Sequence, residues 1–373
     1  MYKVLIISSR LDFHSRAVAW ALKKHGANVV FFDTTSFSGE DMEAAFNINS
    51  ACANFEIGKI TDFDAIYNRR SYPAKATSEM PAPLRKFVES EHNAFCRWML
   101  SALPHHHNGI CVDPPDRVKF AENKALQLVS AHRASLIIPE TIISSSPRRI
   151  RQFSLDHPRG VVYKPLTGHF WTRAGIPRYQ TQTAAIRDIS LLSDASISAC
   201  PGIYQEMIDK VGDIRAVVIG NRVFSALITP SGRLAADEVD HRRCLFLGDF
   251  EAKEFRLPPE VEKGLLDVTR DFGLSYSAAD FALDKNGRLI FLELNPAGQF
   301  GYVEQIVPSL RILDALVKLL LRRDLVRTED LPAVTLSDYE STSDAADFLS
   351  EAESSDSQAL RPNFVVSELN GFA

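Results

Sequence analysis

The sequence of 373 residues predicts an α/β fold in which a parallel sheet opens the chain and two further lobes follow. Residues 3–8 have the pattern of a buried strand, residues 15–25 that of a helix capped by Gly26, and residues 29–33 that of a second strand. This β-α-β order is typical of a parallel sheet, because parallel strands need a crossover connection. From residue 203 onward the chain is rich in strand patterns.

The composition excludes several classes of protein. Hydrophobic residues make up 45% and charged residues 24% of the chain, and the net charge is -5. A chain with this acidic excess is not expected to bind nucleic acid or a membrane surface, because phosphate groups attract basic proteins. No apolar run is long enough to span a bilayer. The five cysteines form no CxxC pair, so neither a zinc site nor a disulfide framework is expected, and we predict a cytoplasmic protein.

The elements suggest four parts of the chain. Strand and helix patterns at residues 64–68 and 83–103 complete an N-terminal domain over 1–111. A central lobe over 112–202 begins with a helical pattern at 119–133, and a strand-rich C-terminal lobe covers 203–327. The tail, 328–373, is rich in Asp, Glu, Ser and Ala and has no Lys or Arg before Arg361. Such a segment buries little apolar surface, so we predict that it is disordered.

The first turn argues against one common use of a β-α-β unit. Residues 8–14 read Ser-Ser-Arg-Leu-Asp-Phe-His and lack the Gly-rich fingerprint of dinucleotide-binding proteins. A nicotinamide cofactor, and with it a dehydrogenase, is therefore disfavoured.

The strongest chemical signal lies at residues 276–299. Two apolar strands flank Asn286-Gly287, the preferred pair for a two-residue type I′ turn, and that turn would place Asp280 opposite Glu293. Asn295 would share the face of Glu293, since side chains alternate along a strand. Two opposed carboxylates destabilise a sheet unless a cation lies between them, and oxygen ligands suit Mg²⁺. The alternative is an exposed polar face, which the apolar neighbours disfavour.

Two other groups of residues suit a nucleotide. The connector that follows the strand at 203 could bind adenine through its backbone, and Asp213 could accept hydrogen bonds from ribose hydroxyls; an ordinary linker between lobes is the alternative. Lys124 and Lys164 could neutralise phosphates, and Lys164 ends a strand before a Gly-containing loop. The predicted adenine-binding residues are Gln205, Glu206, Met207 and Ile208.

The order of these residues along the chain resembles the ATP-grasp superfamily. The resemblance implies an ATP-grasp fold with a Rossmann-like N-terminal domain, a central lobe and a C-terminal ATP-binding lobe. It also implies ATP and Mg²⁺ as cofactors, with both lysines on the phosphates and the connector on adenine. The implied metal ligands are Asp280, Glu293 and Asn295.

A narrower resemblance covers residues 1–320. The motifs that carry it are Asn-Arg69-Arg70, Asn123-Lys124, Lys164-Pro-Leu, Asp240-His-Arg242 and Glu293-Leu-Asn-Pro-Ala-Gly-Gln-Phe. Together they resemble the microviridin-type graspetide synthetases, which join side-chain carboxylates of ribosomally made peptides to hydroxyls or amines. The resemblance implies a precursor peptide with a leader segment as partner, and a homodimer. Family members usually carry tryptophan where this chain has Tyr67 and His241, which leaves the peptide substrate open.

The implied mechanism assigns roles to five arginines. Arg215 and Arg242 are expected to stabilise the charge of an acyl phosphate, with Arg243 as a weaker candidate. Arg69 and Arg70 could orient a substrate carboxylate, or could form a structural ion pair between domains. Two rival functions stay open: an amino-acid ligase of the ribosomal-protein glutamate ligase type, and a degenerate ATP-grasp protein that binds nucleotide without catalysis.

Overall fold

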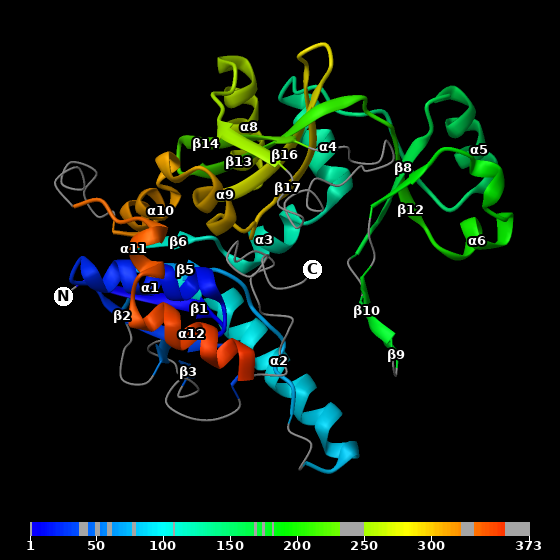
Figure 1. The fold of residues 1–373 in the computed structure, drawn as a ribbon. Coiled ribbons are helices and arrows are strands. Elements are labelled where there is room, and N and C mark those ends of the chain that lie inside the picture. The colour runs from blue at the N-terminus through cyan, green and yellow to red at the C-terminus, as the bar shows by residue number, and fades with distance from the viewer. Residues whose placement is uncertain are drawn as a thin grey trace.

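The computed structural model describes residues 2–36, 44–48, 53–57, 62–76, 80–106, 109–167, 170–173, 176–180, 183–231, 250–321 and 332–354. Within these ranges the chain forms three sheets of four or five strands and two small two-stranded ribbons (Figure 1). None of the helices described is long and apolar enough to cross a membrane.

The N-terminal part is built on a parallel sheet with the strand order β2-β1-β5-β6, as the opening pattern predicted. Side chains of β1 alternate between two cores: Val4 and Ile6 pack with α1, and Leu5 and Ile7 pack with α2. The elements of this part are β1 (Lys3–Ser8), α1 (Phe13–Lys24), β2 (Asn28–Asp33), β5 (Ala65–Asn68), α2 (Ala82–His106), β6 (Ile110–Val112) and the ribbon β3 (Ala44–Ile48) and β4 (Ala53–Ile57).

The central lobe contains an antiparallel sheet with the order β11-β8-β12-β7. Helices α5 and α6 cover it through a small core that includes Ile150, Ile197 and Tyr204. The ribbon β9–β10 projects from this lobe (Figure 1). The elements are β7 (Thr141–Ser144), α5 (Pro147–Asp156), β8 (Val161–Pro165), β9 (Phe170–Arg173), β10 (Ile176–Gln180), β11 (Ala184–Ile186), the 3₁₀ turn η2 (Ile189–Leu191), α6 (Asp194–Ala199) and β12 (Gly202–Glu206).

The C-terminal lobe contains the largest sheet, with the antiparallel order β15-β14-β13-β16-β17. One face packs with α3, α4 and α8, and the other with α9, α10 and the N-terminal part. The elements are β13 (Lys210–Ile219), β14 (Arg222–Pro230), β15 (Phe250–Glu254), α8 (Pro259–Asp271), β16 (Tyr276–Asp284), β17 (Leu289–Asn295), α9 (Gly301–Ile306), the 3₁₀ turn η3 (Pro308–Leu310) and α10 (Ile312–Leu320).

The single helix predicted over residues 119–133 is in fact two helices, α3 (Pro115–Ala121) and α4 (Lys124–Arg133). Asn123 separates them, because its side chain accepts hydrogen bonds from the backbone N–H groups of Ala125 and Leu126 and so caps α4. Asparagine favours this capping geometry over the interior of a helix. The cap makes Lys124 the first residue of α4.

The prediction of a disordered tail is wrong for residues 332–354. They form α11 (Leu336–Glu340) and α12 (Ser343–Ser354), which pack against α1 (Figure 1). Apolar side chains of the tail are buried there, among them Tyr339 and Phe348. Arg16 on α1 pairs with Asp344 and Glu351 and so offsets part of the acidic charge from which disorder was inferred. Residues 328–331 and 355–373 lie outside the described part of the chain.

Phe348→Ala is expected to weaken the packing of α12 on α1. Its fully buried ring lies 5.7 Å from the ring of Phe13, centroid to centroid, and truncating a buried phenylalanine costs about 3–5 kcal/mol. Amide hydrogen exchange in residues 343–354 should therefore become faster. Leu349→Ala is the control, because Leu349 is 37% exposed. Equal protection of α12 in wild type and Phe348→Ala would contradict the packing described.

Candidate active site

The hairpin β16–β17 brings Asp280 opposite Glu293, as predicted, but through a different turn. The turn has three residues, 285–287, because Asp284 N donates to Arg288 O and Gly287 N donates to Asp284 O. Gly287 has φ +79, which fits a glycine at the end of such a loop. The predicted two-residue type I′ turn is therefore wrong.

A β-bulge compensates for the extra residue in the turn. The register pairs Phe281 with Phe291 but Asp280 with Glu293, so Leu292 is the additional residue on β17. Without the bulge, Asp280 would face Leu292, whose side chain alternates with that of Glu293. The bulge thus places both carboxylates on one face of the sheet.

Three charged residues form a row across neighbouring strands. Arg215 on β13 lies opposite Asp280 on β16, which lies opposite Glu293 on β17. Nη1 of Arg215 donates to both carboxylate oxygens of Asp280 at 2.9 Å. Arg215 is only 6% exposed; burial opposes its charge, but the carboxylate of Asp280 and the neighbouring tyrosines together outweigh that effect, so the pKa of Arg215 is raised. The guanidinium therefore stays charged.

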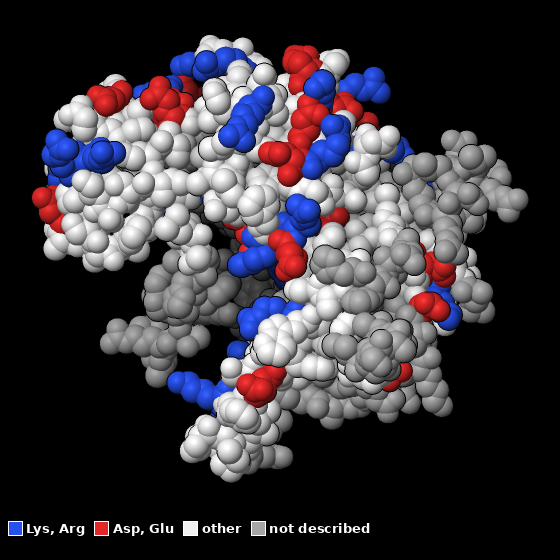
Figure 2. Space-filling model, turned by 180° about the vertical axis from the view of Figure 1, so that it is seen from behind, with Lys and Arg blue, Asp and Glu red and all other residues white. Residues whose placement is uncertain are grey.

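Two lysines from other elements approach the same row. Nζ of Lys124, at the start of α4, lies 2.8 Å from Oε2 of Glu293. Lys164, on β8 of the central lobe, also lies close to Glu293; burial lowers its pKa and the carboxylate of Glu293 partly offsets this. Burial alone would raise the pKa of Glu293, but Lys124 and Lys164 lower it to about 2. No pattern in the sequence indicated that Lys124 would contact Glu293. Figure 2 shows Lys and Arg side chains around a hollow in one face of the molecule.

The donor set of the row suits Mg²⁺. Asp280 and Glu293 supply carboxylate oxygens, and the amide of Asn295 lies within 3.1–3.2 Å of both carboxylates through Nδ2. Amide orientation follows from the hydrogen-bond network, so the same side chain can present Oδ1 to a cation. In the described ranges no group of three or more His, Cys, Asp or Glu side chains could hold a metal. The two carboxylates could hold Mg²⁺ together with water and phosphate oxygens, and Asn295 could supply a third protein ligand.

The connector predicted to bind adenine links β12 to β13. The side chain of buried Gln205 donates to Thr141 Oγ1, and Glu206 pairs with Glu140 through backbone and side chain. Met207 N donates to Gly160 O at 3.3 Å. These contacts fix the connector to β7 and to the residue before β8. Asp213 is buried on β13, where Lys210 donates to both of its carboxylate oxygens.

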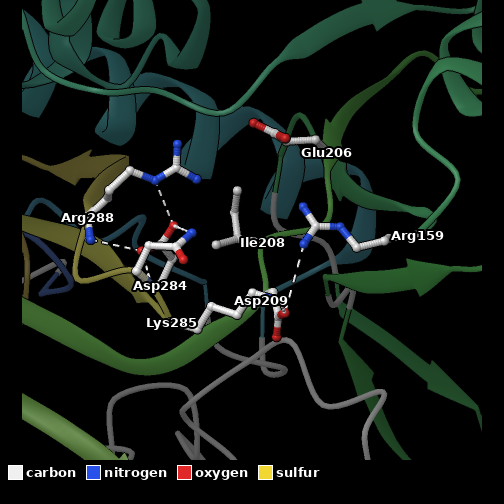
Figure 3. Close-up of a pocket in the computed structure, with 8 residues that line it drawn as sticks. Arg159, Glu206, Ile208, Asp209, Asp284, Lys285 and Arg288 are labelled. Carbon is white, nitrogen blue, oxygen red and sulfur yellow. Dashed lines mark hydrogen bonds and ion pairs between the residues drawn. The ribbon is translucent and has the colours of Figure 1, made fainter.

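A small pocket opens beside the connector (Figure 3). Glu206 and Ile208 lie on one side of it, and the β16–β17 turn lies on the other. Its rim is charged: Asp209 pairs with Lys285 at 2.6 Å and with Arg159 at 3.9 Å. None of Asp280, Glu293 and Asn295 lines this pocket, so it is separate from the row of metal-ligand candidates.

The loop after β17 is held by the N-terminal part of the chain. Arg69 and Arg70 both donate to the carbonyl of Ala297, and Nε2 of His14 accepts a hydrogen bond from Gly301 N. These contacts favour a structural role for Arg69 and Arg70, which was the alternative to binding a substrate carboxylate. Arg242 and Arg243 lie outside the described residues, as does His241.

His14 should make stability depend on pH. Burial, and then Arg69, lower its pKa to about 3; Asp12 opposes this and Arg70 adds to it. Because the folded-state pKa lies below the usual histidine value of 6.5, His14 contributes stability that is complete above pH 6.5 and is lost as the pH falls toward 3. The slope should reach about 1.4 kcal/mol per pH unit. Urea unfolding at pH 7 and pH 5 tests this.

His14→Gln is the matched variant for that experiment, because glutamine keeps an acceptor for Gly301 N but does not titrate. The difference in unfolding free energy between wild type and variant should shift by about 2 kcal/mol in favour of the variant between pH 7 and pH 5. Parallel pH profiles would contradict the assignment.

Several solved structures have the same fold as this chain. The macrocyclase MdnC bound with precursor peptide MdnA, from Microcystis aeruginosa MRC, is 28% identical; the match covers 85% of this chain and 99% of MdnC, with a TM-score of 0.71. A Chryseobacterium gregarium RiPP-associated ATP-grasp ligase in complex with ADP and a leader and core peptide is 20% identical over 89% of this chain and 98% of that one, with a TM-score of 0.75.

A more distant solved structure shares the fold. A RimK domain protein ATP-grasp from Sphaerobacter thermophilus is 15% identical over 86% of this chain and 100% of that one, with a TM-score of 0.50. No protein-family model matches the sequence, and no curated protein matches it. The chain has the fold of the ATP-grasp ligases, which are ATP-dependent enzymes, and within that fold it resembles the RiPP-associated ligases and macrocyclases.

Proposed function

We propose that this chain is an ATP-dependent peptide maturase that joins Asp or Glu side chains of a precursor peptide to Ser or Thr hydroxyls or Lys amines. The row Arg215–Asp280–Glu293, with Lys124 and Lys164 beside it, is the observation that carries the proposal. The likeness to MdnC over 85% of the chain supports a precursor peptide with a leader as the partner. Because the reaction consumes ATP, we place the protein in the cytoplasm. The resemblance to the graspetide synthetases also leads us to expect a homodimer.

Nucleotide would lie between the central and C-terminal lobes. Lys124 and Lys164 would bind its phosphates, the connector 205–208 its adenine, and Asp213 its ribose. Asp280, Glu293 and Asn295 would hold Mg²⁺, which supplies charge neutralisation on the transferring phosphoryl group. Solved neighbours contain ADP, and two of them contain Mg and ADP together, which supports these cofactors.

The chemistry takes place in two steps. A substrate carboxylate oxygen attacks the γ-phosphorus of ATP, the bond to the β-phosphate oxygen breaks, and ADP leaves an acyl phosphate behind. A hydroxyl or amine then attacks the acyl carbon and loses its proton while inorganic phosphate departs. Lys164 and Arg215, together with Arg242, would stabilise the oxygens whose negative charge increases, and no covalent enzyme nucleophile is needed.

Mass spectrometry of a candidate precursor peptide, incubated with the chain, ATP and Mg²⁺, tests the proposal. A peptide encoded beside the gene and rich in Asp, Glu, Ser, Thr and Lys is the substrate to use. Loss of one water per ring is the expected result. A gain of one amino-acid mass would instead favour the amino-acid ligase, and an unchanged peptide despite ATP binding would favour a nucleotide-binding protein without catalysis.

A further inference from the structure

The segment Asn295–Gly301, here called the metal loop, is held through consecutive backbone groups. The carbonyl of Ala297 accepts from Arg69 at 2.6 Å and from Arg70 at 3.1 Å. The carbonyl of Gly298 accepts from the hydroxyl of Tyr276 at 2.6 Å, and that of Gln299 from Arg215 at 3.4 Å. The loop begins with Asn295, one of the metal-ligand candidates, so these contacts bear on the geometry of that site.

The metal loop has little freedom to shift. A Cβ on Gly298 would lie 2.4 Å from Cβ of Ala278 and 2.7 Å from Nη2 of Arg215. Gly298 N also donates to the carbonyl of Asn295, which closes a tight turn directly after the ligand candidate. The backbone is therefore pressed against β16 at Gly298, and Arg69 and Arg70 hold the adjacent carbonyl of Ala297.

Arg69 is itself fixed within the N-terminal part. Arg69 comes directly after β5 and is only 3% exposed. Its Nε lies 3.6 Å from Oδ1 of Asp12. Asp12 caps α1 through Ser15 N and accepts a hydrogen bond from the hydroxyl of Tyr72. The guanidinium therefore joins two parts of the chain: Nη1 donates to the carbonyl of Ala297, and the charge is paired with Asp12, while buried Nε and Nη2 have no hydrogen-bond partner among the described residues. The contact with Ala297 supports a positioning role.

We propose that Arg69, anchored by Asp12, is a positioning residue through which the N-terminal domain sets the metal loop and hence the place of Asn295 beside Glu293. The inference rests on the proposed function, because it concerns the Mg²⁺ that accompanies the nucleotide. Groups that orient a metal ligand without touching the metal typically change metal affinity by about 10–100-fold when removed. Arg69 should act on metal binding rather than on nucleotide binding as such.

Isothermal titration calorimetry of ADP, with and without Mg²⁺, separates these effects without requiring turnover. Wild type should bind ADP more tightly when Mg²⁺ is present. Arg69→Ala should lose about tenfold or more of this Mg²⁺-dependent gain while its affinity for ADP alone stays within about twofold. Arg69→Lys keeps the charge and a donor, so it should recover part of the Mg²⁺-dependent increase in ADP affinity. Arg16→Ala is the matched control, since Arg16 pairs with α12 and should leave the gain unchanged.

The same titrations contain the results that would overturn the inference. One such result is that Arg69→Ala keeps the full increase in ADP affinity that Mg²⁺ causes in wild type, and only raises the KM for peptide. In that case Arg69 binds substrate and the positioning role is wrong. Should Arg69→Ala fail to fold, Arg69→Lys and Asp12→Asn provide the test, and an unchanged Mg²⁺ gain in both would refute it. Wild type that binds no ADP at all would instead show that the proposed function has failed.

Discussion

Glu293→Gln is expected to remove nearly all ATP-dependent modification of the peptide. The carboxylate lies between Asp280, Asn295 and Lys124, and glutamine has almost the same volume but no charge. A metal ion and its ligands contribute several kcal/mol of transition-state stabilisation to phosphoryl transfer, so kcat should fall by about a thousandfold or more. The measurement is the initial rate of ADP release, with the mass of the peptide product determined in parallel.

Glu251→Gln is the control for this experiment. Glu251 is exposed on β15 of the same sheet, away from the row of charged residues, and its substitution should leave the rate unchanged. The unfolding free energy of Glu293→Gln should fall only modestly: Lys124 is more than a quarter exposed and water can solvate it, while Lys164 loses one nearby counter-charge. A folded Glu293→Gln variant with normal rates would rule out Glu293 as a metal ligand.

The sequence predicted the chemical content of this site better than its geometry. Alternation along one strand placed Glu293 and Asn295 on one face, and counting from the expected turn placed Asp280 opposite Glu293. The turn assumed for that register was wrong. The bulge at Leu292 restored the pairing, and no local sequence pattern indicates that bulge. Bulges depend on how the whole sheet packs, so counting from a turn is reliable only over a few residues.

Contacts between distant segments were beyond the reach of the sequence. Three contacts at the site join residues more than 160 positions apart: Lys124 with Glu293, Arg69 with Ala297, and His14 with Gly301. Composition also misled in the tail, since a few large apolar side chains, above all Tyr339 and Phe348, bury enough surface to outweigh an acidic average. Patterns averaged over a segment cannot register such single positions.

Arg215→Met should cost both stability and activity, and the two losses can be separated. Removing the guanidinium leaves Asp280, whose side chain is 15% exposed, without its ion-pair partner, and breaking a buried pair on one side costs about 3–5 kcal/mol. It also removes the donor to the carbonyl of Gln299 in the metal loop. Urea unfolding should therefore show a lower midpoint, and the rate of ADP release should fall sharply.

The double variant Arg215→Met with Asp280→Asn distinguishes the two causes. Neutralising both partners removes the unpaired buried charge, so most of the lost stability should return. Activity should not return, because one metal ligand and the cation that would stabilise the acyl phosphate are then both missing. Recovery of activity together with stability would mean that Arg215 serves only to offset the charge of Asp280. Stability without activity would place at least one of the two residues in the reaction itself, since charge balance alone could then no longer explain the loss.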